Sequence, residues 1–295
     1  MLAPCDCLFI LVHSGYQYLQ RMGIRATAAG LTVAAMRTFP ATGISLIVHK
    51  YRGTGRVVVF FTRERGKVEA VARGVGKPGS KLASLVEPLT LSKLFLAKGR
   101  ELDHLTEGDV INPFYGLRSN MRRFGYASYV AELTARATEP DLPMPQLFEA
   151  LRASLEALEG GATPDIITWG FALRLLGQLG VGPVLEQCAN CGQSLTGQLR
   201  YSPSAGGLIC GDCAPAGGAG GLAVSGMTAG LLRCVATFPI DRLLRLSCPL
   251  PSREEIGQIV RRHIEYHLGF VPRSQRFIEE MEKSGERPHE GDEQG

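Results

Sequence analysis

The chain has no stretch of about 18 or more consecutive apolar residues, the length that a membrane-spanning helix needs. Its first apolar run, Cys7 to Val12, is much shorter and lacks the basic flank and the small-residue cleavage site of a secretory signal. We therefore expect no contact with a membrane and a cytoplasmic location. Apolar residues nevertheless make up 45% of the chain, which is ample for folded cores.

Motifs for nucleotide hydrolysis and other catalysis are also missing. Gly74-Val-Gly76-Lys77 looks like part of a phosphate loop, but Val71 stands where that loop needs its first glycine, and Pro78 where it needs serine or threonine. No cluster of carboxylates suits magnesium, which argues against a nuclease. Four histidines have no obvious carboxylate or nucleophile partner: His49, His104, His263 and His267. We therefore expect a protein that is not an enzyme and has no catalytic residues.

Eight cysteines in 295 residues are too few for a dense disulfide framework, but four of them are spaced as metal ligands. Cys188 and Cys191 are followed, after eighteen intervening residues, by Cys210 and Cys213. Two such pairs, each in a tight turn at the end of a short hairpin, place four thiolates around a tetrahedral zinc ion. Because no coordination position stays open for water or substrate, we expect the zinc to be structural.

The residues between the cysteine pairs predict a small zinc ribbon. Gln198 to Ser202 and Leu208 to Ile209 are short strand candidates separated by a turn. Two disulfides, or four unrelated buried thiols, are the alternative to a metal site. A zinc deaminase is disfavoured because its His-x-Glu precedes the cysteines, whereas His263-Ile-Glu265 follows them. We assign no role to the remaining cysteines, Cys5, Cys7, Cys234 and Cys248.

The net charge of +4 is unevenly distributed along the chain. From Lys50 to Arg123 there are 15 Lys and Arg against 7 Asp and Glu, which gives +8 for this segment and −4 for the rest. A solvated surface that happens to be basic is the simplest explanation. The arrangement of the cations instead favours a nucleic-acid partner, since a row of cations can follow a phosphate backbone. They occupy a predicted hairpin and the loop after it: Arg63, Arg65, Lys67, Arg73, Lys77 and Lys81.

Short segments rich in Val, Ile, Phe and Thr predict a small all-β barrel, for which an OB-type barrel is the most economical choice. The predicted strands are Ile44 to His49, Val57 to Thr62, Lys67 to Ala72, Thr90 to Leu96 and a weaker Leu102 to Leu105. OB barrels bind single strands by combining cations with stacking aromatic rings, and Tyr51, Phe60 and Phe61 supply rings here. Because neighbours on a strand point to opposite sides, we expect at least one of Phe60 and Phe61 in the barrel core and leave open which ring stacks on bases.

After Asn112-Pro113 the apolar residues recur at spacings of three and four, which predicts helices. These are Met121 to Ala137, Gln146 to Leu158, Asp165 to Leu179, Thr228 to Thr237, Ile240 to Leu246, Ser252 to Leu268 and Arg273 to Lys283. Trp169 is expected in their core. Residues 1–35 show neither helical nor strand periodicity, and the polar residues from Ser284 onward are expected to be disordered.

These patterns predict an α+β multidomain protein: an N-terminal OB-type β-barrel and a C-terminal helical domain with an inserted zinc ribbon. The predicted parts are an unassigned extension (1–35), an OB-fold DNA-binding domain (36–113), a helical domain (114–186 and 217–283), the zinc ribbon (187–216) and a disordered tail (284–295). The side chains predicted to bind DNA are Arg63, Lys67, Arg73, Lys77 and Lys81.

The chain also carries a series of short motifs: Phe61-Thr-Arg-Glu64, Gly66-Lys67, Ala72-Arg-Gly74, Lys77-Pro-Gly-Ser80, Glu87-Pro88, Tyr129-Val-Ala-Glu-Leu133, Leu147-Phe148, Leu179-Gly-Val-Gly-Pro183, the cysteine tetrad with Gly206-Gly207 before its second pair, and Arg273-Ser274. Their order and spacing resemble the bacterial recombination mediator family RecO, from about Arg37 to Met281. Two features depart from that family. Its members usually begin near the position of Met36, and the Lys50 to Gly55 segment is glycine-rich where an acidic residue is common.

The resemblance implies a non-enzymatic role in DNA repair and recombination. Its elements are binding of single- and double-stranded DNA, annealing of complementary strands, and cooperation with the partner RecR in loading recombinase onto strands coated by single-strand-binding protein. It implies a nucleoid-associated location in the cytoplasm. Neutralising the phosphates of two strands leaves their base edges free, so we expect little sequence specificity. The alternatives are a generic zinc-ribbon nucleic-acid-binding adaptor without annealing activity, and a zinc-dependent hydrolase.

Overall fold

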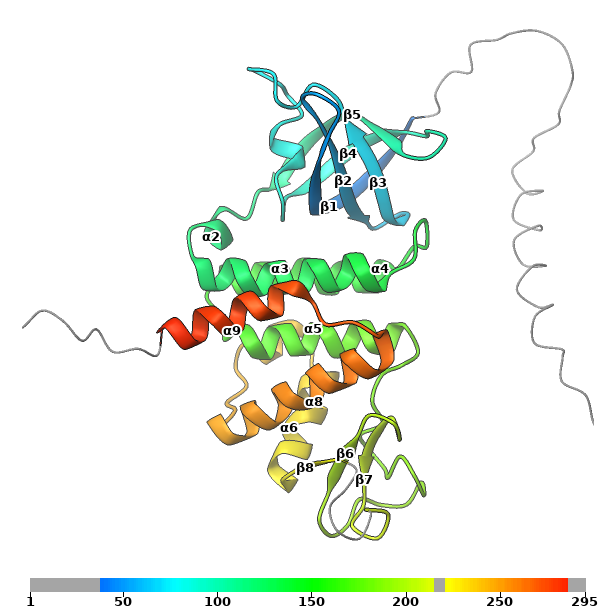
Figure 1. Cartoon of the computed structure of the whole chain (residues 1–295), viewed down its shortest axis with the longest axis vertical. Coiled ribbons are helices and arrows are strands. Elements are labelled where there is room, and N and C mark those ends of the chain that lie inside the picture. The colour runs from blue at the N-terminus through cyan, green and yellow to red at the C-terminus, as the bar shows by residue number, and fades with distance from the viewer. Residues whose placement is uncertain (1–37, 215–220, 286–295) are drawn as a thin grey trace, which may run out of the picture. The chain divides into compact units, whose positions relative to one another are not determined.

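The computed structural model describes residues 38–214 and 221–285. A closed five-stranded barrel comes first, a helical part follows, and a three-stranded sheet is inserted between helices α5 (Pro164–Gln178) and α6 (Gly226–Thr237) (Figure 1). The predicted fold class, an OB-like barrel followed by a helical part, is confirmed. The predicted extension at 1–35, most of the predicted tail at 284–295 and the residues around the predicted end of the ribbon, 215–220, lie outside the described residues.

The barrel consists of β1 (Thr38–Tyr51), β2 (Gly55–Thr62), β3 (Gly66–Ala72), β4 (Leu91–Ala97) and β5 (Asp103–Asn112). The strand order is β1-β2-β3-β5-β4, and only the β3–β5 pair is parallel. A 3-10 turn, η1 (Ser84–Val86), lies in the β3–β4 connection and buries Leu85 and Val86. Strand β5 continues well past its predicted end at Leu105. The C-terminal half of β5, from Thr106 to Asn112, is mostly polar and largely exposed. This half is a strand because it pairs with β4, and not because of an apolar sequence pattern.

Strand β2 is buried on both faces, which explains its continuous apolar sequence. Val58 and Phe60 belong to the core inside the barrel, whereas Val59 and Phe61 belong to the core shared with the helices. The rings of Phe61 and Phe148 lie 6.5 Å apart, centroid to centroid. Successive side chains of a strand point to opposite faces, so a run without polar residues requires cover on both sides.

The other helices are α2 (Tyr115–Arg118), α3 (Met121–Ala137), α4 (Pro145–Glu159), α7 (Ile240–Leu243), α8 (Leu250–Leu268) and α9 (Arg273–Gly285). Side-chain caps begin two of the helices: the Asn120 side chain accepts from the Arg123 N–H of α3, and that of Ser225 from the Thr228 N–H of α6. Helix α5 is the centre of the helical part, in contact with α3, α4, α6, α7 and α8. Figure 1 shows α3 and α4 next to the barrel, and contacts between α3 and strand β1 agree with this.

Two of the predicted helices differ from the structure by more than one residue at their C-terminal ends. Helix α7 stops at Leu243 rather than at Leu246, because Arg245 N–H and Leu246 N–H donate to carbonyls three residues back and form turns instead of a helix. Helix α9 continues to Gly285, so Ser284 and Gly285 are helical. The N-terminus of α9 is fixed by α3, since Glu132 accepts hydrogen bonds from the N–H groups of Arg273 and Ser274.

The β2–β3 hairpin contacts the segment that connects α3 to α4. Gly66 lies there at φ 67°, and a Cβ atom added to it would come within 1.8 Å of the Leu142 carbonyl oxygen. Asp141 N–H donates to the Lys67 carbonyl oxygen at 2.9 Å. Arg65 forms ion pairs with Asp141 and, at 2.8 Å, with the buried Asp103 of β5. We call residues 63–67 the hairpin end of the barrel.

The inserted sheet has the order β7 (Gly207–Ile209), β6 (Arg200–Ser202) and β8 (Leu222–Ala223). Strand β8 was not predicted. Tyr201 of β6 is fully buried, and its hydroxyl contacts His263 Nδ1 of α8. The other ring nitrogen, His263 Nε2, lies 2.6 Å from the Val181 carbonyl oxygen and must donate to it, which leaves Nδ1 to accept from Tyr201. The sheet is therefore anchored to the helices through a buried polar contact.

Candidate functional site

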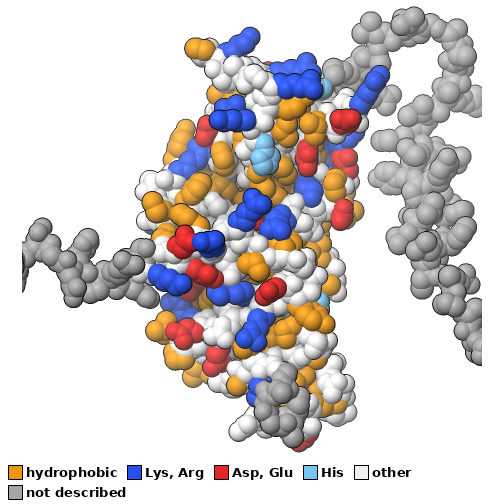
Figure 2. All heavy atoms as spheres, in the orientation of Figure 1, with side chains coloured by type: hydrophobic (Ala, Val, Ile, Leu, Met, Phe, Trp, Pro, Cys, Tyr) orange, Lys and Arg blue, Asp and Glu red, His pale blue; other side chains and the backbone are white. Residues whose placement is uncertain are grey.

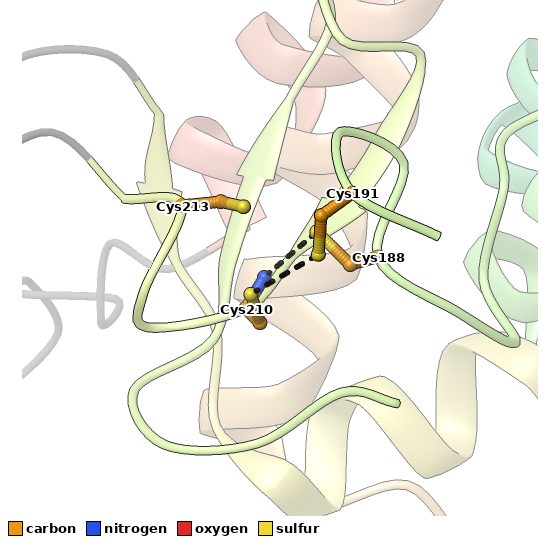
Figure 3. A group of neighbouring side chains, drawn as sticks. All are labelled: Cys188, Cys191, Cys210 and Cys213. Atoms are coloured by element: carbon orange, nitrogen blue, oxygen red, sulfur yellow. Dashed lines mark hydrogen bonds between the residues drawn. The ribbon is translucent and has the colours of Figure 1, made fainter. Parts of the chain in front are cut away.

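The four predicted metal ligands come together at one point. Cys188 and Cys191 lie in the turn before β6, and Cys210 and Cys213 lie in the turn after β7. The four sulfur atoms are all within 4.8 Å of one another, and the side chains converge (Figure 3). Tetrahedral zinc with bonds of about 2.3 Å requires sulfur atoms about 3.8 Å apart. The distance between Cys191 Sγ and Cys210 Sγ is 3.8 Å, so this donor set can hold a metal ion of that size.

The backbone around the cluster favours thiolate at one end of it. Burial alone raises the pKa of Cys188, but hydrogen bonds from the N–H groups of Cys191, Cys210 and Asn190 outweigh burial and lower that pKa to about 6. A hydrogen bond to Asn190 lowers the pKa of Cys213, yet contacts with the thiols of Cys191 and Cys210 prevail and raise it to about 12. The first thiol therefore ionises easily and the last does not. Four thiolates at this distance need a cation between them.

A second candidate site lies at the opposite end of strands β2 and β3 from the hairpin. Here the β1–β2 turn (52–54) meets the start of the β3–β4 connection (73–77), and we call these residues the loop end of the barrel. Arg52, Arg73 and Lys77 are exposed there, and Lys81 follows on the same connection. Among the described residues, none of these four side chains has an ion pair or a side-chain hydrogen bond. Figure 2 shows Lys and Arg side chains gathered over this part of the barrel.

The structure separates the five predicted DNA-binding residues into two groups. Arg73, Lys77 and Lys81 belong to the group just described. Arg63 lies at the hairpin end, where its Nε is 3.6 Å from Glu149 Oε1 of α4, and Lys67 Nζ donates to the Ala135 carbonyl oxygen of α3 at 2.9 Å. The five residues therefore do not form one continuous surface. DNA contacts through Arg63 and Lys67 stay a prediction.

The aromatic rings predicted to stand beside the cations have different environments. Phe60 lies in the barrel core, as expected for at least one of the pair, and Phe61 is equally buried against Phe148. The hypothesis that one of them stacks on bases is therefore wrong, because helices cover the outer face of β2. Tyr51 is half-buried at the loop end, and the Arg52 guanidinium lies 5.9 Å from its ring centroid.

Sequence reasoning did not identify Arg52 as part of the basic site. Gly76 N–H donates to the Thr54 carbonyl oxygen at 3.0 Å, and this contact brings the β1–β2 turn beside Arg73 and Lys77. The available signal was the glycine-rich turn Gly53-Thr-Gly55 between two predicted strands. That signal predicts a turn, but it does not predict which other segment of the chain lies beside the turn.

A groove of about 780 Å³ lies among α3, α5, α8 and α9. Trp169 was expected in the core. It packs against the core but is half-buried and lines this groove. The charged lining is mixed: Arg253 pairs with Asp165 at 2.5 Å, and Tyr126 donates to Glu282 at 2.5 Å. These paired charges distinguish the groove from the loop end.

No helix in the described part of the chain has the length and apolar character required to cross a membrane.

Comparisons with known proteins cover both parts of the fold. Residues 36–114 match the family model described as Recombination protein O N terminal, and residues 118–276 match the one described as Recombination protein O C terminal. A protein named DNA repair protein RecO from Bacillus subtilis is 34% identical over 240 residues, which are 81% of this chain and 93% of that protein. One of the same name from Pelotomaculum thermopropionicum is 34% identical over 244 residues, 83% of this chain and 94% of the relative. One from Listeria monocytogenes is 31% identical over 241 residues, 82% and 94% of the two chains.

Proposed function

Because the chain belongs to the RecO family of DNA repair proteins, we propose that it is a recombination mediator that binds single- and double-stranded DNA and anneals complementary strands. It works with RecR and single-strand-binding protein to load recombinase onto coated strands, in the nucleoid-associated cytoplasm, and it is not an enzyme. The observation that carries the DNA-binding part is a group of cations at and beside the loop end that have no acidic partner within residues 38–214 and 221–285: Arg52, Arg73, Lys77 and Lys81.

Unpaired cations suit phosphate binding better than paired ones do. A phosphate that meets Arg65 must compete with Asp103 and Asp141, whereas one that meets Arg73 or Lys77 displaces only water and counterions. Two complementary strands repel each other through their phosphates. Cations that neutralise the phosphates lower the barrier to their encounter and leave the base edges free to pair.

We propose further that the metal held by the four cysteines is zinc and that its role is structural. All four positions of a tetrahedral ion are then filled by thiolates, so no water is activated and a zinc-dependent hydrolase is disfavoured. Bound zinc supplies the charge that allows Cys213 to ionise beside three other thiolates. The cysteine turns hold the two ends of the β6–β7 hairpin, and Tyr201 anchors that hairpin to α8.

The test of the DNA site is a salt titration of affinity together with a strand-annealing assay. With about four phosphate contacts on single-stranded DNA, log affinity should fall with log salt at a slope of roughly −3. Lys77→Glu with Lys81→Glu should weaken binding to all sequences alike and reduce the slope by about 1.4 in magnitude.

The matched control carries the same change of charge on the helical part, Arg245→Glu with Arg262→Glu. Both arginines are exposed, and neither has an ion pair among the described residues. This control should bind and anneal like the parent. Equal losses in both double variants would show that only net charge matters. An unaffected Lys77/Lys81 variant would move the site elsewhere, and DNA binding without annealing would favour the adaptor.

The test of the metal is elemental analysis of protein purified without chelator, with one zinc per chain expected. Cys191→Ser should lose the metal and unfold the inserted sheet while the barrel stays folded, because the barrel supplies no ligand. Cys234→Ser is the control, since that thiol lies on α6 outside the cluster. Protein without zinc, or with zinc retained in Cys191→Ser, contradicts the proposal.

A further inference from the structure

The loop end of the barrel is hollowed between its two loops. A cavity of about 550 Å³ is lined there by Tyr51, Arg52, Thr54, Arg73, Gly74 and Lys77. Small-molecule sites in proteins have volumes of about 300 to 1,000 Å³, so this hollow has room for one nucleotide.

Backbone contacts set the shape of this hollow. The hydrogen bond from Gly76 N–H to the Thr54 carbonyl oxygen closes one side, and Lys77 N–H donates to the Gly74 carbonyl oxygen at 3.1 Å. Gly74 has φ 71°, a left-handed conformation that reverses the chain at this point. The Lys77 side chain consequently lies back over Gly74, since a Cβ atom added to Gly74 would be 3.7 Å from Lys77 Cδ.

The lining combines cations with one aromatic ring. Arg52, Arg73 and Lys77 approach from both loops, no acidic residue lines the cavity, and none of the three has an ion pair among the described residues. Tyr51 is the only aromatic residue that the described part of the chain contributes to the lining, and the Arg52 guanidinium is 5.9 Å from its ring centroid. Phosphate binds to such cations, and a nucleic-acid base stacks on such a ring.

We infer that this hollow holds one nucleotide of an unpaired DNA strand, with its phosphate among Arg52, Arg73 and Lys77 and its base against Tyr51. The inference rests on the proposed DNA binding and adds a single-strand-specific contact to it. A base within a duplex is stacked on both faces and cannot turn toward Tyr51 without unstacking, which costs a few kcal/mol. Duplex DNA is therefore bound through its phosphates alone.

The cations beyond the hollow favour a strand over a free nucleotide. Lys50 precedes the β1–β2 turn and Lys81 follows the hollow on the β3–β4 connection, and both are exposed without an ion pair to a described residue. A single nucleotide would leave these cations unused. A strand places further phosphates near them.

The test compares Tyr51→Leu with the ring-preserving control Tyr51→Phe, on a single-stranded oligonucleotide and on a duplex at one salt concentration. Tyr51→Leu should bind the single strand about 10-fold more weakly and the duplex like the parent, with an unchanged salt slope, because a base contact but no phosphate contact is lost. Tyr51→Phe should behave like the parent on both.

A second measurement needs no change in the protein. An oligonucleotide with abasic sites keeps every phosphate and lacks the bases, so the parent should bind it about 10-fold more weakly than the normal strand. A free deoxynucleotide at millimolar concentration should not displace the strand. If it does, the hollow is a site for free nucleotides and our assignment to a strand is overturned.

The inference is also overturned if the parent binds abasic and normal strands equally, or if Tyr51→Leu weakens single-strand and duplex binding alike. In both cases the parent still binds DNA and the proposed function stands. A parent that binds no DNA would remove the proposed function itself, so the two failures are distinct.

Discussion

The two ends of the barrel carry similar cations, but these cations differ in whether acidic side chains or carbonyl groups contact them. At the hairpin end, Arg65 forms ion pairs with Asp103 and Asp141, and Lys67 donates to a helix carbonyl. At the loop end, Arg73 and Lys77 have no acidic partner among the described residues. The hairpin end contacts the helical part, whereas Arg73 and Lys77 form no ion pair or side-chain hydrogen bond with any described helix. Cations without acidic partners are more available to phosphate, and this difference supports our proposal that DNA binds at the loop end while the hairpin end contacts the helices.

The largest expected loss of stability comes from substituting Gly66, and Gly79, which also has a positive φ, is its control. Gly66→Ala should reduce the free energy of unfolding by more than about 4 kcal/mol, since the left-handed conformation costs an alanine about 1 to 2 kcal/mol and its Cβ would also overlap the Leu142 carbonyl oxygen. Gly79 has φ 74°, and no atom of the described residues lies within 4 Å of a Cβ added there. Gly79→Ala should therefore cost only about 1 to 2 kcal/mol, the cost of the left-handed conformation. Chemical denaturation measures both. Equal losses would show that the hairpin end is not tightly docked.

The next largest effect is expected when one cation is removed from each end of the barrel. Arg65→Ala should cost about 3 kcal/mol of unfolding free energy, because it removes the 2.8 Å ion pair of the buried Asp103. Asp103 then keeps the more distant Lys98 Nζ at 3.5 Å and the Gly99 N–H at 3.2 Å. Arg73→Ala should change stability by less than about 0.5 kcal/mol, as is usual for an exposed residue without partners. Thermal or chemical denaturation without DNA is the measurement. A stable Arg65→Ala protein would contradict the docking role.

A third effect concerns the inserted sheet. Like the hairpin end, this sheet contacts the helical part through buried polar groups. Burial lowers the pKa of His263 to about 4, against the opposing hydrogen bond with the Val181 carbonyl. The unfolded chain binds this proton near pH 6.5, and the folded chain only near pH 4. The contribution of neutral His263 to the free energy of unfolding is therefore fully present above pH 6.5. As the pH falls from 6.5 to 4, the free energy of unfolding decreases by about 3 kcal/mol.

The His263 prediction is checked by measuring unfolding free energy against pH for the parent and for His263→Gln. The difference between the two proteins should shrink as the pH falls through this window, whereas a difference that is constant from pH 7 to pH 4 contradicts the prediction. His104→Gln is the control, since that half-buried histidine lies on β5, away from the inserted sheet.

The smallest expected effect tests the DNA assignment one cation at a time. Arg73→Met should reduce the magnitude of the salt slope on single-stranded DNA by about 0.7, the value for one phosphate contact. Arg63→Met and Lys67→Met should each reduce the slope by less than this, because their side chains already contact Glu149 and the Ala135 carbonyl. Equal changes in all three variants would instead restore the single continuous surface that the sequence predicted.

Local chemistry made several features predictable. The cysteine spacing identified all four sulfur atoms of the cluster, since two short turns joined by a hairpin leave little choice of geometry. Helix α3 has the bounds that its apolar spacing predicted, Met121 to Ala137, because the Asn120 cap and the amphipathic repeat lie within the segment itself. The barrel was predictable from its apolar strands, and its hairpin from Gly66.

Other features depend on residues distant in the sequence. The C-terminal half of β5 is a strand because it pairs with β4, and the short β8 because it pairs with β6. The burial of Phe61 depends on Phe148, 87 positions later in the chain. A single strand pattern cannot indicate that its second face is covered, because a continuous apolar run is compatible with several partners.

The sequence by itself determined the four clustered cysteines, the order of the barrel strands and of the longer helices, and the excess of positive charge in the barrel. Only the tertiary structure decided which cations carry unbalanced charge. Acids from other elements neutralise Arg65, whereas no acid in the described part of the chain pairs with Arg73 or Lys77. The tertiary structure also placed Arg52 and Tyr51 beside them through the contact between Thr54 and Gly76. Charge is a property of a residue, whereas its neutralisation depends on distances of a few ångströms between residues that the chain keeps far apart.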